Sequence, residues 1–182
     1  MKQVHHVDAV RAQAIRLGMP PGAALLLVET ANQRLLAHVD AGTPGIYPVS
    51  TSRFGLNERE GSFGTPRGFH AICERYGERL PPGAVLSSRV FTGEVLPRAE
   101  WSSGSGDDRI LSRILRLAGM EPGINQGGAV DTYARMIYLH GTNQEHLVGK
   151  TPASHGCIRL RNDDIIALFE RLSGRDAWCW IA

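Results

Sequence analysis

The sequence predicts one small, mainly β domain with about three helices, and three observations support this. The chain has 182 residues, enough for one domain with a real core and short for two. It contains 21 glycines and 10 prolines, as is typical of short strands joined by turns. No repeat, linker or change in composition divides the sequence, so we expect a single domain over residues 1–182.

The first half of the chain predicts a helix followed by strands. Asp8 is placed to cap a short helix through Leu17, and Gly18 would end it. The polar, glycine- and serine-rich stretch 98–108 predicts a loop, either a plain surface connection or a lid over a site. Apolar runs bounded by turn sequences predict five strands before that loop, over residues 24–30, 34–39, 46–52, 69–77 and 84–91.

The second half predicts two further helices and two strands. The segment 109–119, starting after Asp107 or Asp108, has apolar residues at helical spacing and predicts a helix. The apolar, β-prone segment 135–141 predicts a strand. A third helix capped by Asn162 and a final buried strand over 177–182 complete the predicted fold.

Composition and charge exclude several classes of protein. Twenty basic residues against 18 acidic ones give a net charge of +2, and the cations are scattered, so nucleic acid is not an expected partner. The apolar run 23–28 is too short to span a membrane. The N-terminal residues lack the apolar segment of an export signal, and three cysteines cannot form a full disulfide framework. We therefore expect a cytoplasmic protein, or a periplasmic one if a leader has been removed.

The segment ASHGCIRLR holds the candidate nucleophile, Cys157. A catalytic thiol needs a lowered pKa, a base within reach, and donors for the oxyanion that forms on the attacked carbonyl. Gly156 allows a tight turn in which consecutive N–H groups converge, and Arg159 places a cation two residues from the sulfur. The adjacent His155 and the more distant His140 are both candidate bases.

A structural cysteine is the main alternative for each thiol. Cys73 and Cys179 have core-like neighbours and are interpreted as core residues. Cys157 fits that interpretation less well, because a preceding glycine and a following arginine are poor core neighbours.

A zinc site is the second alternative. Its possible ligands match no known zinc spacing, so we expect neither a metal nor another cofactor. These possible ligands are His140, His146, His155 and Cys157.

Two motifs together resemble one enzyme family. The sequence LHGT at 139–142, followed by SHGCIRL at 154–160, is similar to the catalytic motif of the L,D-transpeptidase family, also called the YkuD domain. The upstream TPRGF at 65–69 is similar to a further segment of that family. The resemblance covers about residues 23–173 and implies a small, mainly β sandwich or barrel.

The resemblance also implies roles for the residues of the site. Cys157 would be the nucleophile and His140 the general base, with the carbonyl of Gly141 orienting the imidazole in place of a carboxylate. His155 and Gly156 would shape the oxyanion site together with Cys157. The residues expected to contact substrate are Thr142, Ser154 and Arg159.

Arg159 has two interpretations that the sequence leaves open. Its guanidinium is suited to a bidentate ion pair with a carboxylate of the substrate. Alternatively, it forms a structural ion pair with Asp163 or Asp164.

The family resemblance implies an enzyme that acts on peptidoglycan stem tetrapeptides through a thioester. It would cut the bond between the L-centre of residue three, which is diaminopimelate or lysine, and the D-Ala that follows. With water as acceptor the enzyme is an L,D-carboxypeptidase of muropeptide recycling, which we expect because no export signal is found. An amine acceptor would give 3→3 cross-links, and a D-amino acid would give exchange. A non-catalytic peptidoglycan-binding domain is disfavoured, because His140 and Cys157 are both present.

Overall fold

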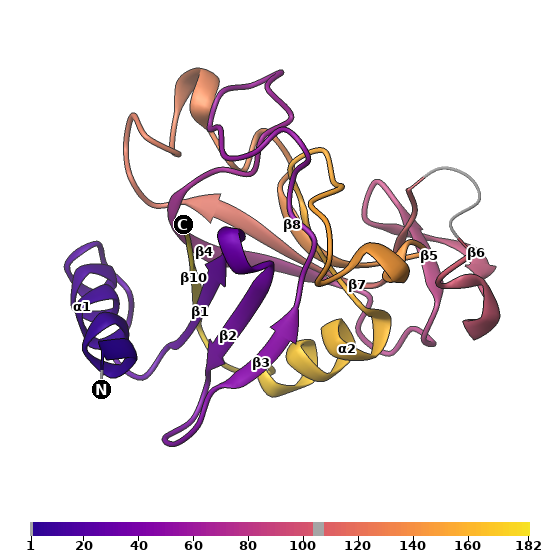
Figure 1. Cartoon of the computed structure of the whole chain (residues 1–182), viewed down its shortest axis with the longest axis horizontal. Coiled ribbons are helices and arrows are strands. Elements are labelled where there is room, and N and C mark those ends of the chain that lie inside the picture. Colours follow the sequence, from indigo (N-terminus) through magenta and orange to yellow (C-terminus); the bar gives the residue numbers. More distant parts are fainter. Residues whose placement is uncertain (1, 104–107) are drawn as a thin grey trace.

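The computed structural model describes residues 2–103 and 108–182, and side chains from Val7 onward. In these ranges the chain forms a curled β-sheet and two α-helices, which confirms the mainly β prediction (Figure 1). The helices are α1 (Lys2–Arg16) and α2 (Asn162–Arg171). The strands are β1 (Ala24–Glu29), β2 (Arg34–His38), β3 (Gly45–Pro48), β4 (Gly68–Tyr76), β5 (Ala84–Ser87), β6 (Val90–Val95), β7 (Ile110–Gly119), β8 (Tyr138–Thr142), β9 (Ile158–Leu160) and β10 (Ala177–Ile181).

The strands follow one path with a branch. Hydrogen-bonded neighbours run in the order β3-β2-β1-β10-β4-β7-β5-β6, and β8 adds to β7 as a third partner. Most pairs are antiparallel, but β1 pairs with β10 and β8 pairs with β9 in parallel. The parallel β8–β9 pair brings together the two motifs that the sequence analysis singled out.

The two helices cover opposite faces of the sheet. Because side chains alternate along a strand, Leu25 and Leu27 of β1 face α1, whereas Leu26 and Val28 pack in the cluster that includes α2. Figure 1 shows α1 lying beside β1 and β4, and α2 across the sheet from it. The cluster on the α2 side also includes Leu139 of β8 and Ile158 and Leu160 of β9, so it anchors the β8–β9 pair.

The segment predicted as a helix over 109–119 is the strand β7, so that prediction is wrong. β7 lies inside the sheet, with β8 along one edge and β4 and β5 along different parts of the other edge, and both of its faces are covered. Nearly every residue of β7 is therefore buried. A strand buried on both faces has no polar alternation, so its apolar residues can match helical spacing by coincidence.

Other predicted boundaries also change. The segment 84–91 is a hairpin rather than one strand, because the chain turns at Ser88 and Arg89 between β5 and β6. α1 begins at Lys2, before the cap predicted at Asp8. Asn162 is the first residue of α2 and not its cap, which is Arg161.

Two further predictions from the sequence need comment. Cys179 is fully buried, as expected, but Cys73 is exposed, because it lies at a register shift between Ile72 and Glu74 where β4 is irregular. The predicted loop 98–108 begins with a short 3-10 turn at Arg98–Glu100. Whether this loop acts as a lid depends on residues 104–107, which lie outside the described ranges.

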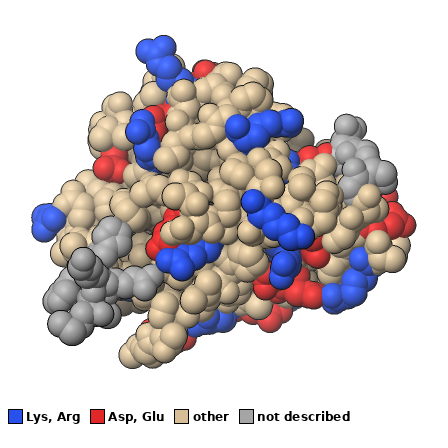
Figure 2. All heavy atoms as spheres, in the orientation of Figure 1, with Lys and Arg blue, Asp and Glu red and all other residues tan. Residues whose placement is uncertain are grey.

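On the face shown in Figure 2, charged side chains of one sign do not form a large patch. Positive and negative side chains are interspersed over the face shown in Figure 2, in keeping with the small net charge. Within the described ranges, no helix is long and apolar enough to cross a membrane.

A buried histidine links β4 to the loop before β8. His70 is fully buried, with Nδ1 3.0 Å from the carbonyl oxygen of Gly68 and Nε2 3.2 Å from the hydroxyl of Thr132. Burial lowers the pKa of His70 to about 4, so the side chain is neutral in the folded protein at pH 7.

We predict that His70 makes folding sensitive to acid. The unfolded chain binds a proton below the ordinary pKa of 6.5, whereas the folded chain does so only near 4. The free energy of unfolding should therefore fall by up to about 3 kcal/mol as pH drops from 6.5 to 4. Denaturant unfolding at several pH values measures this slope. His70→Gln should flatten it and the exposed His146→Gln should not; equal slopes in wild type and His70→Gln would contradict the prediction.

Candidate active site

The parallel pairing of β8 and β9 determines which side chains meet. His140 is the register partner of Arg159, and Cys157 directly precedes β9. Leu139 and Ile158 point into the core beneath α2, so the alternating residues His140 and Arg159 lie on the opposite face. Cys157, two residues before Arg159, joins them there. The structure thus brings the two predicted catalytic side chains to one face of adjacent strands.

His140 is held in one tautomer. Its Nδ1 lies 2.8 Å from the carbonyl oxygen of Gly141, and since a carbonyl can only accept a hydrogen bond, Nδ1 carries the proton. Nε2 therefore keeps a lone pair. The side chain is 2% exposed, and burial lowers its pKa, partly countered by the negative charge of Asp108. His140 is thus a neutral imidazole near pH 7 with Nε2 able to accept a proton.

Cys157 is a protonated thiol in this structure. It is half-buried against Ile114 and Tyr138, and its Sγ donates to the carbonyl oxygen of Met136 at 3.7 Å. Burial raises the pKa of the thiol to about 11, against the opposing charge of Arg159. The sequence analysis expected a lowered pKa, whereas burial in this structure raises it.

The turn before Cys157 is fixed by side-chain hydroxyls. Ser154 Oγ donates to the carbonyl of Cys157 at 2.6 Å and accepts from the N–H of Gly156 at 3.2 Å. Thr65 Oγ1, from the TPRGF segment, donates to the carbonyl of Gly156 at 3.0 Å. The N–H of Gly156 is occupied in this arrangement, so its role in binding an oxyanion stays a prediction.

Gly156 requires glycine for two reasons. Its φ of +128° is unfavourable for residues with a side chain, and a Cβ would lie 3.0 Å from Ile137 Cδ1. The tight turn expected at this position is therefore present, and it places Cys157 at the start of β9.

Arg159 is committed to an internal ion pair. It is 1% exposed, with Nη2 2.5 Å from an oxygen of Asp108 and Nη1 2.9 Å from Gln144 Oε1. The structural interpretation named Asp163 or Asp164 as partner, and this is corrected: Asp163 pairs with Arg98 instead. A buried guanidinium needs compensation by a carboxylate, and Asp108 supplies it.

The other two residues expected to contact substrate have internal partners. Thr142 is fully buried, and its Oγ1 donates to Asp108 at 3.1 Å. Ser154 is 1% exposed and holds the turn described above. The structure gives both hydroxyls a positioning function, and substrate contact by either stays a prediction.

His155 lies at the rim of the site. Its side chain is exposed, and its Nε2 lies 2.5 Å from Arg53 Nη2. Its ring also contacts Phe54 and Phe63, with centroids 5.8 and 5.9 Å away. Burial and the charge of Arg53 both lower the pKa of His155. Because its neighbours are all at the rim, His155 is better placed to shape the entrance than to act as base.

An open hollow of about 410 Å³ lies beside this rim. Its lining is mostly polar and includes both ends of the Arg159–Asp108 ion pair. The lining residues are Arg53, Asp108, Gln144, Leu147, Pro152, Ala153, His155 and Arg159.

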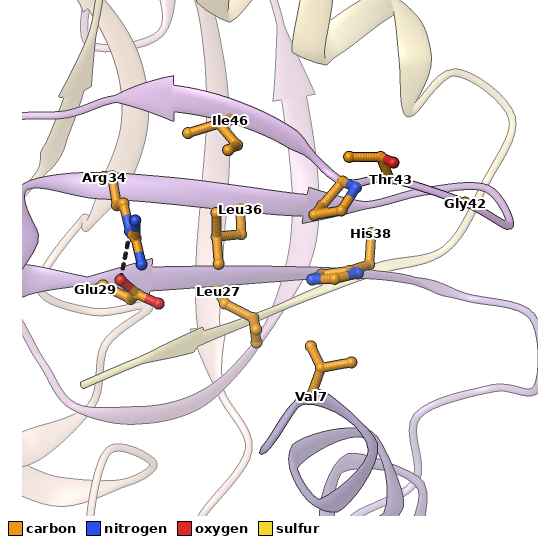
Figure 3. Close-up of a pocket in the computed structure, with 10 residues that line it drawn as sticks. Val7, Leu27, Glu29, Arg34, Leu36, His38, Gly42, Thr43 and Ile46 are labelled. Atoms are coloured by element: carbon orange, nitrogen blue, oxygen red, sulfur yellow. Dashed lines mark hydrogen bonds and ion pairs between the residues drawn. The ribbon is translucent and has the colours of Figure 1, made fainter. Parts of the chain in front are cut away.

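An apolar hollow of similar volume lies elsewhere, between α1 and strands β1, β2 and β3 (Figure 3). The Glu29–Arg34 ion pair closes one end, and His38 lies toward the other. None of its lining residues belongs to the segments that carry His140 and Cys157, so we place the candidate active site at β8 and β9.

The proposed zinc ligands do not converge. His146 is exposed, and His155 is engaged with Arg53. Across residues 2–103 and 108–182, no three histidine, cysteine, aspartate or glutamate side chains are grouped as metal ligands would be.

Several residues that build the site were not singled out from the sequence. Asp108 and Thr65 come from segments distant from the motif. Arg135 donates to the carbonyl oxygens of Glu58 at 2.7 Å and Gly64 at 2.6 Å, which ties the loop around residues 57–64 to the strand β8 region. Of these residues, only Thr65 could have been found from the sequence, because the TPRGF segment that contains it resembles a segment of the family.

Comparisons with known proteins agree with this geometry. The family profile of the L,D-transpeptidase catalytic domain, YkuD, matches residues 23–177. YqjB of Bacillus subtilis (strain 168), a candidate L,D-transpeptidase by name, is 32% identical over 152 residues, which cover 84% of this chain and 68% of YqjB.

Solved structures share the fold. An L,D-transpeptidase from Mycobacterium smegmatis superposes with a TM-score of 0.51 at 17% identity, covering 88% of this chain and 58% of that one. An L,D-transpeptidase from Xylanimonas cellulosilytica gives a TM-score of 0.50 at 17% identity, covering 88% and 60%. This chain thus spans about three fifths of the length of these solved chains.

We predict that Gly141→Ala disrupts the orientation of His140. A Cβ at Gly141 would lie 2.3 Å from Asn162 Oδ1 and 2.6 Å from the carbonyl oxygen of Leu111, so the backbone must shift. The free energy of unfolding should fall by about 1–3 kcal/mol. Because the Gly141 carbonyl accepts from Nδ1, the imidazole ¹⁵N shifts of His140 should also report a mixture of tautomers. Gly93→Ala is the control: its φ of +90° makes alanine costly there, but with open space around it the His140 shifts should stay unchanged. Unchanged ¹⁵N shifts in Gly141→Ala would contradict the prediction.

Proposed function

Because the chain belongs to the L,D-transpeptidase catalytic domain family (YkuD), we propose that it is a cysteine-dependent enzyme of peptidoglycan stem tetrapeptides. It would cut the bond between the L-centre of residue three and D-Ala. One observation carries the proposal: the bond from His140 Nδ1 to the Gly141 carbonyl leaves Nε2 as a proton acceptor on the face that bears Cys157.

In the first half-reaction His140 acts as base and then as acid. Nε2 takes the proton from Cys157 Sγ while the sulfur forms a bond to the substrate carbonyl carbon. The carbon–nitrogen bond then breaks, and His140 returns the proton to the departing D-Ala amine. A thioester on Cys157 remains. Because burial raises the thiol pKa to about 11, the attack depends on His140 as the base that removes the thiol proton.

In the second half-reaction we propose that water is the acceptor. His140 removes a proton from water, the water oxygen attacks the thioester carbonyl, and the sulfur leaves and regains its proton. The product is a tripeptide, so the activity is that of an L,D-carboxypeptidase in muropeptide recycling. Such recycling takes place in the cytoplasm, and the proposal therefore assigns the protein to that compartment.

The charges around the hollow support water over an amine. Its lining carries Arg53 and Arg159 against one carboxylate, Asp108, which is already paired with Arg159. An acceptor amine arrives as an ammonium ion near pH 7, and a net positive lining repels it. Water has no such barrier.

Transpeptidation is the second candidate, because the relatives are named L,D-transpeptidases. With a diaminopimelate amine as acceptor the same thioester would give a 3→3 cross-link. With a D-amino acid it would give exchange.

We predict that Cys157→Ala lowers turnover at least ~10³-fold. The assay is mass spectrometry of a disaccharide-tetrapeptide incubated with the protein, in which wild type should remove one D-Ala. Cys73→Ala, which removes an exposed thiol, should retain activity.

The products of this assay separate the alternatives. A dimer or D-amino-acid exchange would establish transpeptidation in place of hydrolysis. Turnover by Cys157→Ala would contradict the cysteine mechanism, and no turnover by wild type would support a peptidoglycan-binding domain instead.

We predict that activity persists below the ordinary pKa of histidine. The base must be neutral, and burial lowers the pKa of His140 from 6.5, so the acid limb of kcat/KM should have its midpoint below pH 6.5. Initial rates across pH 4 to 8 measure this midpoint, with His146→Gln as the control. A midpoint at or above pH 6.5 would be inconsistent with a buried His140 as base.

A further inference from the structure

The turn between β5 and β6 holds an arginine in an unusual backbone conformation. Ser87 pairs with Val90, so Ser88 and Arg89 form a two-residue turn, with φ values of 48° and 70°. Such turns favour Asn-Gly, because left-handed backbone is costly for residues with a side chain. A bulky arginine persists at such a position when its surroundings hold it in place, which is a frequent property of functional sites.

The side chain of Arg89 reaches the surroundings of Cys157. Its Nη1 donates to the hydroxyl of Tyr138 at 2.9 Å and lies 3.6 Å from Met136 Sδ. Tyr138 belongs to the apolar cluster against which Cys157 packs, and the carbonyl of Met136 accepts from the Cys157 thiol. Arg89 therefore contacts two residues that each contact Cys157.

Among the described residues, Arg89 has no carboxylate partner. None of the arginine–carboxylate ion pairs found in residues 2–103 and 108–182 includes it. The other cations near the thiol have internal partners: Arg159 forms an ion pair with Asp108, and Arg135 donates to backbone carbonyls. Arg89 thus keeps its charge uncompensated, with donors remaining beyond Nη1.

We propose that Arg89 binds a carboxylate of the peptide beside the scissile bond. The inference rests on the proposed function, because that function supplies the substrate. The D-Ala carboxylate is separated from the attacked carbonyl by only the amide nitrogen and one carbon, and diaminopimelate at residue three carries a second carboxylate. A guanidinium suits either by bidentate pairing. Arg89 thereby takes one of the two roles that the sequence analysis left open for Arg159.

The test compares Arg89→Gln with wild type on three substrates. These are the diaminopimelate tetrapeptide acid, its C-terminal amide, and the tetrapeptide acid with lysine at residue three. On the first, Arg89→Gln should lower kcat/KM about 10- to 100-fold, mainly through KM, as expected for loss of a charged hydrogen bond. On the substrate that lacks the bound carboxylate, wild type and Arg89→Gln should have the same kcat/KM.

The amide and lysine arms identify which carboxylate is bound. If wild type and Arg89→Gln have the same kcat/KM on the amide, Arg89 binds the D-Ala carboxylate. If they have the same kcat/KM on the lysine peptide, Arg89 binds the side-chain carboxylate of diaminopimelate. An equal loss on all three substrates would mean that Arg89 only supports the fold, and no loss on any would mean that it has no role; both overturn the proposal. Arg89→Lys, which keeps the charge, should restore part of the preference for the substrate that carries the bound carboxylate.

Two controls make the result specific. Arg79→Gln removes another exposed arginine from a left-handed turn position, in a hollow shared with Phe169, and should leave all three rates unchanged. Arg53→Gln removes the cation beside His155. If Arg53→Gln and not Arg89→Gln abolishes the preference for the acid, the assignment to Arg89 is overturned.

A binding measurement separates this inference from the proposed function. Calorimetric titration of Cys157→Ala with the acid and amide tetrapeptides requires no turnover. If affinity depends on Arg89 but wild type has no activity, the inference holds and the proposed function fails. If replacing Arg89 in the Cys157→Ala protein changes the affinity for none of the acid, amide and lysine peptides, the inference fails.

Discussion

The parallel pairing of β8 with β9 is the constraint on which the site depends. Its register sets His140 against Arg159 and places Cys157 on the same face, while Leu139 and Ile158 enter the core beneath α2. A shift of one residue would turn His140 into that core and Leu139 into the site. All five residues of β8 are buried, so a shifted register would place the polar imidazole among aliphatic side chains and a leucine among the polar groups of the site. The same apolar contacts that stabilise the sheet thus fix the distance and direction between thiol and imidazole.

Burial also sets the protonation states on that face. It lowers the pKa of His140 and raises that of Cys157, so both groups are neutral before substrate binds. The nearest full charges compensate each other, because Asp108 pairs with Arg159. A neutral pair contrasts with the thiolate–imidazolium pair of some cysteine enzymes, and in the proposed mechanism His140 removes the thiol proton as the sulfur attacks.

The local motif predicted more of the site than of its surroundings. The turn at Gly156 follows from a short-range pattern, which survives folding because it involves neighbouring residues. The hydrogen bond between the imidazole and the Gly141 carbonyl was expected from the family resemblance. The segment 109–119 could not be assigned by periodicity, because a strand covered on both faces lacks alternation. The partner of Arg159 depends on how distant segments meet. The same holds for the residues that support the site from far along the chain, namely Thr65, Arg89, Asp108 and Arg135.

The most direct measurement of the central claim is the intact mass of the protein, quenched in acid shortly after mixing with a tetrapeptide substrate. The account predicts a covalent adduct with the mass of the tripeptide acyl group, mapped by proteolysis to the fragment that contains Cys157. The adduct should be labile to hydroxylamine, as thioesters are. D-Ala release with no adduct on that fragment, or with an adduct on another residue, would contradict the account.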